Sequence, residues 1–282
     1  MIAQNLPVYT SEKDPNYVAQ MAINAIPKYH WKASPPNLQF PIYNQVAPSI
    51  TPTIVDLRPY ASPIDDQGNL GSCTGNAIAG AIDLVDYENK KSERVSRLFI
   101  YYQERVIEGD ITKDNGAYIH DGITACSQTG APLESLWPYT VSKFAVQPNQ
   151  TAYTDAAKRK VTGYSKCNNF AAVKTALANK APVVIGFYVY SSFESGTWWQ
   201  PRGTGLMPYP NTRTEQLLGG HAVCIVGYND NLTGPAGKGY FIVRNSWGTS
   251  WGQQGYFYMP YSVIQNTSMS SDFWAITSVA NP

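Results

Sequence analysis

The 282-residue sequence predicts an α+β protein whose helices and strands segregate into two halves. Apolar residues recur at helical spacing mainly before residue 160, whereas β-branched and aromatic runs dominate after Pro182. The first 50 residues differ from both halves because proline interrupts them repeatedly. We therefore expect an N-terminal arm (residues 1–50), a mainly helical domain (51–160) and a β-rich domain (161–282). A ligand site is expected in the cleft between the two domains.

The helices are predicted from apolar spacing and from residues that favour helix ends. Ser96 is placed to cap one helix at its start, and Gly109 is placed to end it. The expected helices are Asn16–Ile26 in the arm, Thr74–Lys91, Ser96–Gly109, Ala117–Gln128 and Phe170–Asn179.

The strands are predicted from runs of Val, Ile, Phe and Tyr that are separated by glycine and asparagine turns. The expected strands are Val183–Tyr190, His221–Tyr228, Gly239–Asn245 and Gly255–Met259.

Composition and charge exclude several classes of protein. Apolar residues make up 43% and charged residues 15%, as in ordinary globular proteins. The formal charge is +1, and the 21 Lys and Arg residues are spread along the chain, so we expect no nucleic-acid partner. No stretch approaches the roughly 18–20 apolar residues of a membrane span, so we expect no membrane partner either. The first residues lack the features of a secretory signal, which leaves a cytoplasmic location or a non-classical export route open.

The four cysteines, Cys73, Cys126, Cys167 and Cys224, are far apart in the sequence and form no C-x-x-C pair. We therefore expect no metal site and no cofactor, and we expect the thiols to be reduced.

Cys73 is the candidate nucleophile. It follows a tight loop with Gly68 and Gly71 and begins a predicted helix, where unpaired N–H groups and the helix dipole favour a thiolate. A lone cysteine in such a place is more often a small buried apolar residue, so the assignment needs a proton partner.

His221 is the best candidate for that partner among three histidines. It follows two glycines and opens an apolar strand, whereas His30 lies in the arm and His120 stands beside Asp121 on a predicted helix. Asn245 is a suitable third member, because an amide can orient an imidazole without adding a charge. Trp247 could shield that hydrogen bond from water.

The order Cys…His…Asn and four motifs resemble the papain and cathepsin family of cysteine peptidases, and Cys73 and His221 are 148 residues apart. The motifs cover residues 53 to 260. They are Val55-Asp56-Leu57-Arg58 with Gln67…Cys73, Asn115-Gly116-Ala117-Tyr118 with Trp137-Pro138-Tyr139, Gly220-His221-Ala222-Val223…Gly227-Tyr228, and Asn245-Ser246-Trp247-Gly248…Trp251-Gly252…Gly255-Tyr256.

The resemblance implies a papain-like two-domain fold, with a helical domain, an antiparallel β-barrel domain and the active-site cleft between them. It implies hydrolysis of peptide bonds in a peptide or protein substrate, through a thiolate–imidazolium pair and an acyl-enzyme. Cys73, His221 and Asn245 would be catalytic, and Gln67 would donate to the oxyanion with the Cys73 N–H.

Substrate residues are also implied by the resemblance. Gly116 would pair its backbone with a bound peptide, and Ile119, Gly186 and Ala222 would line the pocket for the side chain two residues before the scissile bond. The remaining residues expected at the substrate are Asn115, Ala117, Tyr118, Gly220 and Trp247.

Two departures from the family pattern stand near the nucleophile. Leu70 replaces a cysteine of a family disulfide, and Asp114 stands where the partner cysteine is expected. These departures favour a divergent, disulfide-poor branch of bacterial or viral type with a short N-terminal extension. The segment between Ser191 and Leu218 is also longer than the usual connection and is expected to form a flap beside the cleft.

Two alternatives remain open from the sequence. One is a catalytically silent peptide-binding homologue, and the other is an acyl transferase or peptide ligase that uses the same acyl-enzyme. We further hypothesise that the chain is a zymogen, in which residues near 35–50 of the arm reach the cleft and block it. The chain is expected to be a monomer.

Overall fold

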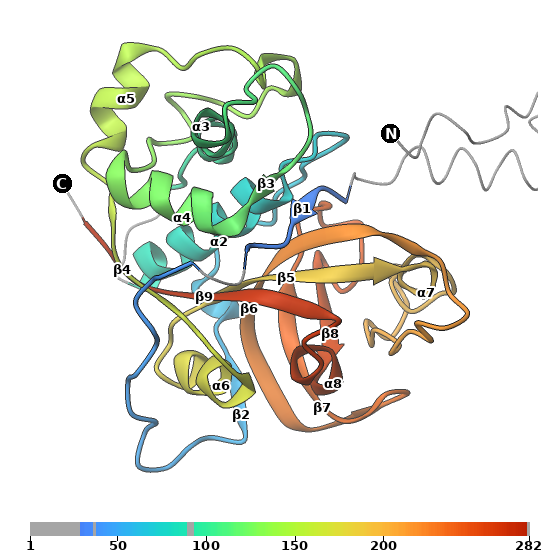
Figure 1. Ribbon diagram of the computed structural model, residues 1–282. Coiled ribbons are helices and arrows are strands. Elements are labelled where there is room, and N and C mark those ends of the chain that lie inside the picture. The colour runs from blue at the N-terminus through green and yellow to red at the C-terminus, as the bar shows by residue number, and fades with distance from the viewer. Residues whose placement is uncertain (1–28, 36–37, 89–92, 281–282) are drawn as a thin grey trace, which may run out of the picture.

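The structure is a computed structural model that describes residues 29–35, 38–88 and 93–280. A group of helices packs on one side of a large antiparallel sheet, and this arrangement agrees with the predicted α+β class (Figure 1). The helical group contains α2 (Cys73–Glu88), α3 (Arg97–Glu108), α4 (Ile119–Gln128) and α5 (Gln150–Ala156). A short strand, β3 (Ala117–Tyr118), directly precedes α4.

The ends of α3 follow from its capping residues. The Ser96 side chain accepts the backbone N–H of Phe99, and Gly109 ends the helix with a positive φ of 71°. The predicted helix is therefore confirmed at both ends.

The sheet holds seven strands in the order β4-β9-β5-β6-β7-β8, with β2 paired to β6 at the side. All of its pairings are antiparallel. The strands are β2 (Ile54–Asp56), β4 (Val161–Lys166), β5 (Val183–Tyr190), β6 (Leu217–Gly234), β7 (Gly237–Arg244), β8 (Tyr256–Pro260) and β9 (Ser270–Val279). The short helices α6 (Phe170–Ala178), α7 (Ser191–Glu194) and α8 (Tyr261–Gln265) lie around the sheet (Figure 1). Within the described ranges there are also two 3-10 turns, at Arg58–Tyr60 and Val141–Lys143.

The central helix α2 contacts both α3 and α4 on one side and strands β6 and β9 on the other. Its apolar side chains Ile78, Ile82 and Leu84 are fully buried. Because α2 fills the junction between helices and sheet, its first residue, Cys73, lies where the two groups meet.

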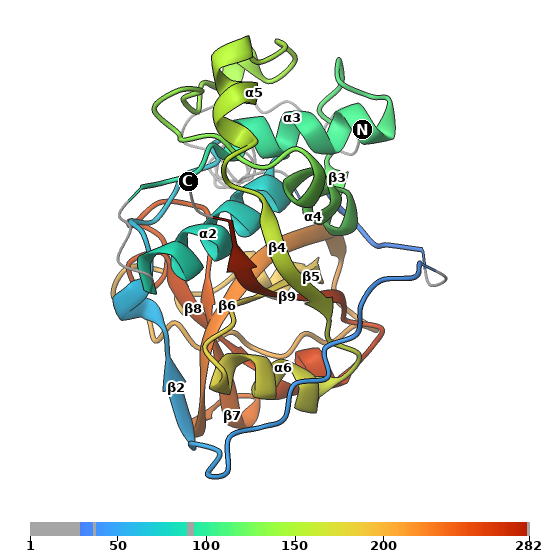
Figure 2. The same ribbon diagram turned by 90° about the vertical axis from the view of Figure 1, so that its left-hand side faces the viewer.

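The described part of the arm starts at this junction and then runs down past α6 towards β2 (Figure 2). Its strand β1 (Trp31–Lys32) pairs in parallel with β3, and further along Tyr43 and Pro41 exchange backbone hydrogen bonds with Lys166 of β4. The helix predicted at Asn16–Ile26 lies outside the described residues. Among the described helices, none has the length and apolar character to cross a membrane.

Candidate active site

Cys73 is the first residue of α2, and its side chain is completely buried. The loop before it turns at Gly68, whose N–H donates to the Asp66 carboxylate at 2.8 Å. Burial raises the pKa of the Cys73 thiol to about 11, although backbone hydrogen bonds from Ala222, His30 and Thr74 oppose the shift. The thiol therefore lies beside Ala222, which directly follows His221 in the chain.

His221 lies on β6, and Asn245 directly follows the neighbouring strand β7. The imidazole Nε2 and the Asn245 Oδ1 are 2.8 Å apart. The other ring nitrogen, Nδ1, is buried and hydrogen-bonds to none of the described residues, so it is the atom left for a proton partner. Trp247 stacks on the imidazole, with ring centroids 4.9 Å apart and planes 28° apart, and this indole covers one face of the ring.

Burial also sets the charge state of the histidine. It lowers the pKa of His221 to about 4, with the Asn245 hydrogen bond opposing the shift. In this closed arrangement both the thiol and the imidazole are therefore favoured in their neutral forms. A thiolate–imidazolium pair requires solvent or a bound polar group to reach the two side chains.

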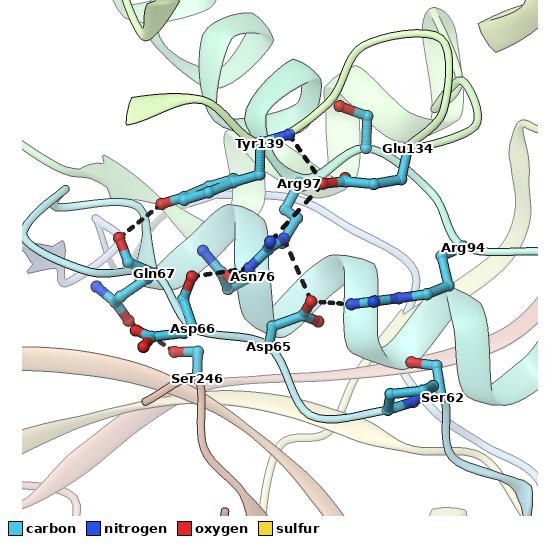
Figure 3. A network of polar contacts seen from close by, with 12 residues as sticks. Ser62, Asp65, Asp66, Gln67, Asn76, Arg94, Arg97, Glu134, Tyr139 and Ser246 are labelled. Atoms are coloured by element: carbon cyan, nitrogen blue, oxygen red, sulfur yellow. Dashed lines mark hydrogen bonds and ion pairs between the residues drawn. The ribbon is translucent and has the colours of Figure 1, made fainter. Parts of the chain in front are cut away.

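Gln67 lies fully buried on the loop before Cys73, and both polar atoms of its side-chain amide are hydrogen-bonded. Figure 3 shows its contacts with Ser246 and Tyr139. Its Oε1 accepts the Ser246 hydroxyl at 2.6 Å, and its Nε2 donates to the Leu70 carbonyl at 2.9 Å. The Tyr139 hydroxyl donates to the Gln67 carbonyl at 2.9 Å. An amide nitrogen carries two hydrogens, so Nε2 keeps a second N–H that can donate a hydrogen bond to an oxyanion.

A buried ionic network anchors this loop to the helices (Figure 3). The Asp65 carboxylate pairs with Arg94 and with Arg97, whose Nε is 3.3 Å away. From the sheet, Arg244 approaches Asp65 at 3.3 Å and donates to the Ser62 carbonyl at 2.6 Å. Because Arg244 directly precedes Asn245, the network ties the Gln67 loop to the end of β7.

The arm fills the space in front of these residues, and glycines let its backbone and side chains approach closely. A Cβ on Gly116 would lie 1.7 Å from the His30 carbonyl oxygen, and a Cβ on Gly186 would lie 1.9 Å from the Trp31 ring. The Tyr29 ring meets the His221 ring edge to face, with centroids 5.8 Å apart. Residues 29–32 therefore cover the thiol and the imidazole.

The residues predicted to bind substrate divide into three groups. Ala117 and Tyr118 pair with Trp31 and Lys32 of the arm, and Gly116, Gly186 and Gly220 also pack against the arm. Ile119 and Ala222 are buried, and Trp247 covers His221. Asn115 is exposed, and its amide donates to Asp110 at 2.8 Å, so the structure does not bring it to the arm.

Asp114 makes polar contacts at the position where the family resemblance implies a disulfide cysteine. Its carboxylate accepts the Gly71 N–H at 2.9 Å and the Tyr101 hydroxyl at 2.7 Å, and this joins the loop before Cys73 to α3. Leu70 beside it is buried, and all four cysteines are free and buried, as expected for a disulfide-poor chain. Within the described ranges, no group of three or more His, Cys, Asp or Glu residues could hold a metal ion.

Several residues of the site were missed by sequence reasoning. The arm reaches Cys73 with residues 29–32, earlier in the chain than the expected 35–50, because residues 41–43 already pair with β4. The signal was the run Tyr29-His30-Trp31, three aromatic side chains within an extended, proline-rich segment. The roles of Ser246 and Tyr139, whose hydroxyl groups donate hydrogen bonds to Gln67, were also not predicted.

Comparisons with known proteins agree with this architecture. A family described as "Papain family cysteine protease" matches residues 51–276. An uncharacterized peptidase C1-like protein of Acanthamoeba polyphaga mimivirus is 39% identical over 86% of this chain and 80% of its own length. Xylellain, a cysteine protease from Xylella fastidiosa, superposes with a TM-score of 0.78 at 34% identity, over 89% of this chain and 97% of its own. Cysteine proteinase 3 of Entamoeba histolytica is 26% identical, and the match spans 76% of this chain and 64% of that protein.

Proposed function

Because the chain belongs to the papain family of cysteine proteases, we propose that it is an endopeptidase that its own N-terminal arm holds inactive. As a papain-like hydrolase it acts on peptides or proteins. The observation that carries the proposal is the placement of residues 29–32, which bury both Cys73 and His221.

The proposed chemistry begins when the arm leaves. The Cys73 thiol passes its proton to Nδ1 of His221, and the thiolate attacks the carbonyl carbon of a peptide bond. The Cys73 N–H, at the start of α2, and the Nε2 of Gln67 donate to the oxyanion. His221 then gives its proton to the leaving amine, and the acyl-enzyme remains.

Water completes the cycle. His221 takes a proton from a water molecule, which attacks the acyl carbon and releases the second product while the proton returns to sulfur. Asn245 holds the imidazole so that Nδ1 faces the sulfur throughout. The substrate backbone takes the place of the arm along β3, where Gly116 leaves room for a close approach.

The arm would inhibit the enzyme in two ways: it blocks access of the substrate, and it disfavours the charged forms of Cys73 and His221. The arm occupies the surface that the substrate would use, and the burial that it completes disfavours the ion pair that the reaction needs. The arm is further held by a hydrogen bond from Tyr29 to Glu194 and by one from the Ser34 N–H to Asp272 at 2.9 Å.

The experiment measures iodoacetamide labelling of Cys73 by intact mass, together with hydrolysis of a fluorogenic peptide, in the full-length chain. Trp31→Ala empties the space against Gly186 and should label at least about tenfold faster than wild type and gain hydrolysis. Phe40→Ala is the control for loss of an aromatic side chain elsewhere in the arm, because Phe40 packs on Trp274 and His120 and not at Gly186. Cys73→Ala identifies the labelled thiol.

Different outcomes separate the alternatives. Equal and fast labelling in wild type and Trp31→Ala would remove the inhibitory role of the arm. Labelling of Cys73 without hydrolysis of any peptide would favour the silent peptide-binding homologue. Products that incorporate an added amine in preference to water would favour the acyl transferase or ligase.

A further inference from the structure

Lys32 of the arm lies in a site that is built for a cation. Its ammonium group pairs with the carboxylate of Glu108, the last residue of α3. The same ammonium lies 5.4 Å from the centre of the Tyr118 ring, so it also meets an aromatic face.

The Glu108 carboxylate is held in place independently of Lys32. Its Oε1 accepts the backbone N–H of Tyr118 at 3.0 Å, and its side chain is only 9% exposed. This bond connects the end of α3 to β3, the strand that pairs with the arm. Glu108 therefore presents a fixed and nearly buried negative charge at the edge of the cleft.

Other acidic side chains lie near the Glu108 carboxylate. An open hollow of about 480 Å³ surrounds the pair and is lined by Glu108, Asp110, Asp121, Tyr118 and His120, together with Lys32 itself. The Nε2 of His120 lies 3.3 Å from the Asp121 carboxylate, and its Nδ1 lies 2.7 Å from the hydroxyl of Ser34, which belongs to the arm. When the arm leaves, Lys32 leaves with it, and the Glu108 carboxylate loses its counter-charge.

The Glu108 carboxylate and the Tyr118 ring stay behind when the arm leaves, and a substrate cation could contact both in place of Lys32. The register of the arm fixes where such a cation enters. Trp31 pairs with Ala117 and fills the space at Gly186, and Lys32 pairs with Tyr118 one residue further on.

We propose that Glu108 determines specificity by binding a lysine or arginine side chain of the substrate, one subsite beyond the space that Trp31 occupies. This inference rests on the proposed function, because it treats the arm as an occupant of the substrate cleft. Lys32 is then the arm's own copy of the side chain that the enzyme selects.

The test uses the full-length chain opened by Trp31→Ala and Lys32→Ala. Fluorogenic peptides carry either arginine or citrulline, which has nearly the same shape but no charge, at each position before the scissile bond in turn. At one position we expect kcat/KM to favour arginine by at least about tenfold, as a charged hydrogen bond in a nearly buried site predicts. Glu108→Gln keeps an acceptor for the Tyr118 N–H, and it should bring the ratio of the two kcat/KM values close to one.

Two further variants control for charge and for folding. Asp110→Asn removes a nearby charge whose partners are Lys113 and Asn115, and it should leave most of the preference intact. Glu108→Asp keeps the charge and should retain part of the preference. Equal labelling rates of Cys73 across the variants would show that the catalytic centre is unaltered.

Hydrolysis of both peptides at equal rates, or a preference that survives Glu108→Gln, would overturn the inference and leave the proposed function standing. Absence of hydrolysis in every opened variant would contradict the proposed function, and the inference would fall with it.

Discussion

The carboxylate of Asp83 accepts the backbone N–H of Val95 at 2.9 Å, and this bond links α2 to the segment that leads into α3. Burial raises the pKa of Asp83 to about 7, although the Val95 and Ser62 hydrogen bonds and the charge of Arg244 oppose the shift. The pKa of an aspartate in an unfolded chain is about 3.9, so between about pH 4 and pH 7 the folded chain binds more protons at this residue. Its contribution to stability is complete below about pH 4 and is lost as the pH rises through 7.

The first prediction is that the stability of the protein falls with rising pH because of Asp83. In wild type, the free energy of unfolding should include a component that falls between pH 4.5 and pH 7.5, and Asp83→Asn should remove it. Asp155→Asn is the control: at Asp155 burial is outweighed by hydrogen bonds from Leu133 and Arg159, which lower its pKa, so its contribution changes below this window. Urea unfolding at several pH values measures both, and an unchanged slope in Asp83→Asn would contradict the assignment.

The second prediction concerns the orientation of the imidazole. Asn245→Ala removes the group that lies 2.8 Å from His221 Nε2, and Trp247 alone should not fix the ring. In the Trp31→Ala background we expect kcat to fall about 10- to 100-fold, as for loss of a buried hydrogen bond. Asn266→Ala, whose amide donates to Tyr209 at the surface, should leave kcat unchanged. Equal rates in the two variants would show that Asn245 does not position His221.

The third prediction separates oxyanion binding from thiol reactivity. Gln67→Ala in the same background should lower kcat by about 10²–10³-fold, because one oxyanion donor is lost. Alkylation of Cys73 forms no oxyanion, so its rate should change by less than about threefold. A parallel loss of both rates would indicate instead that Gln67 supports the loop before Cys73.

The fourth prediction tests the polar link that stands in place of a disulfide. Asp114→Ala leaves the Gly71 N–H and the Tyr101 hydroxyl without their shared acceptor, and it should lower the free energy of unfolding by about 1–3 kcal/mol. Asp114→Asn keeps an acceptor and should cost less. Chemical denaturation measures both, and no loss of stability in Asp114→Ala would mean that water replaces the carboxylate.

Local signals in the sequence predicted α2, α3, α4 and α6 but not α5, α7 or α8, and the start expected for α4 at Ala117 was wrong because Ala117–Tyr118 forms β3. Ser96 and Gly109 mark the ends of α3 through their capping chemistry, which depends only on neighbouring residues. Strand Val183–Tyr190 was also predicted with its observed bounds, because a continuous apolar run without proline is a strong local pattern.

Strands that carry glycine were predicted less well. Strand β6 begins at Leu217, before the expected His221, and the four added residues include Gly219 and Gly220. Glycine weakens the strand signal, but here the lack of a side chain lets Tyr29 and Trp31 of the arm come close. Strands β4 and β9 were not predicted, because their apolar residues alternate irregularly and a bulge interrupts their pairing near Gly163.

In the candidate site too, some residues were predictable from the sequence and others were not. Cys73, His221, Asn245 and Gln67 were assigned from residue types, spacing and resemblance. The parallel pairing of β1 with β3 depends on two segments about 86 residues apart, and no local pattern specifies such a register. Contacts such as Lys32 with Glu108 could therefore come only from the structure.

If the arm blocks the cleft as proposed, its covalent attachment makes that blockage independent of protein concentration. A tethered segment meets its site at an effective concentration in the millimolar range when the linker is short and flexible, so dilution alone would not open the cleft. A single cut between the arm and residue 54 would remove this high effective concentration, because the severed arm could then diffuse away. Its occupancy would follow its own dissociation constant, and a weakly bound arm would be lost on dilution while a tightly bound one would persist as a separate inhibitor.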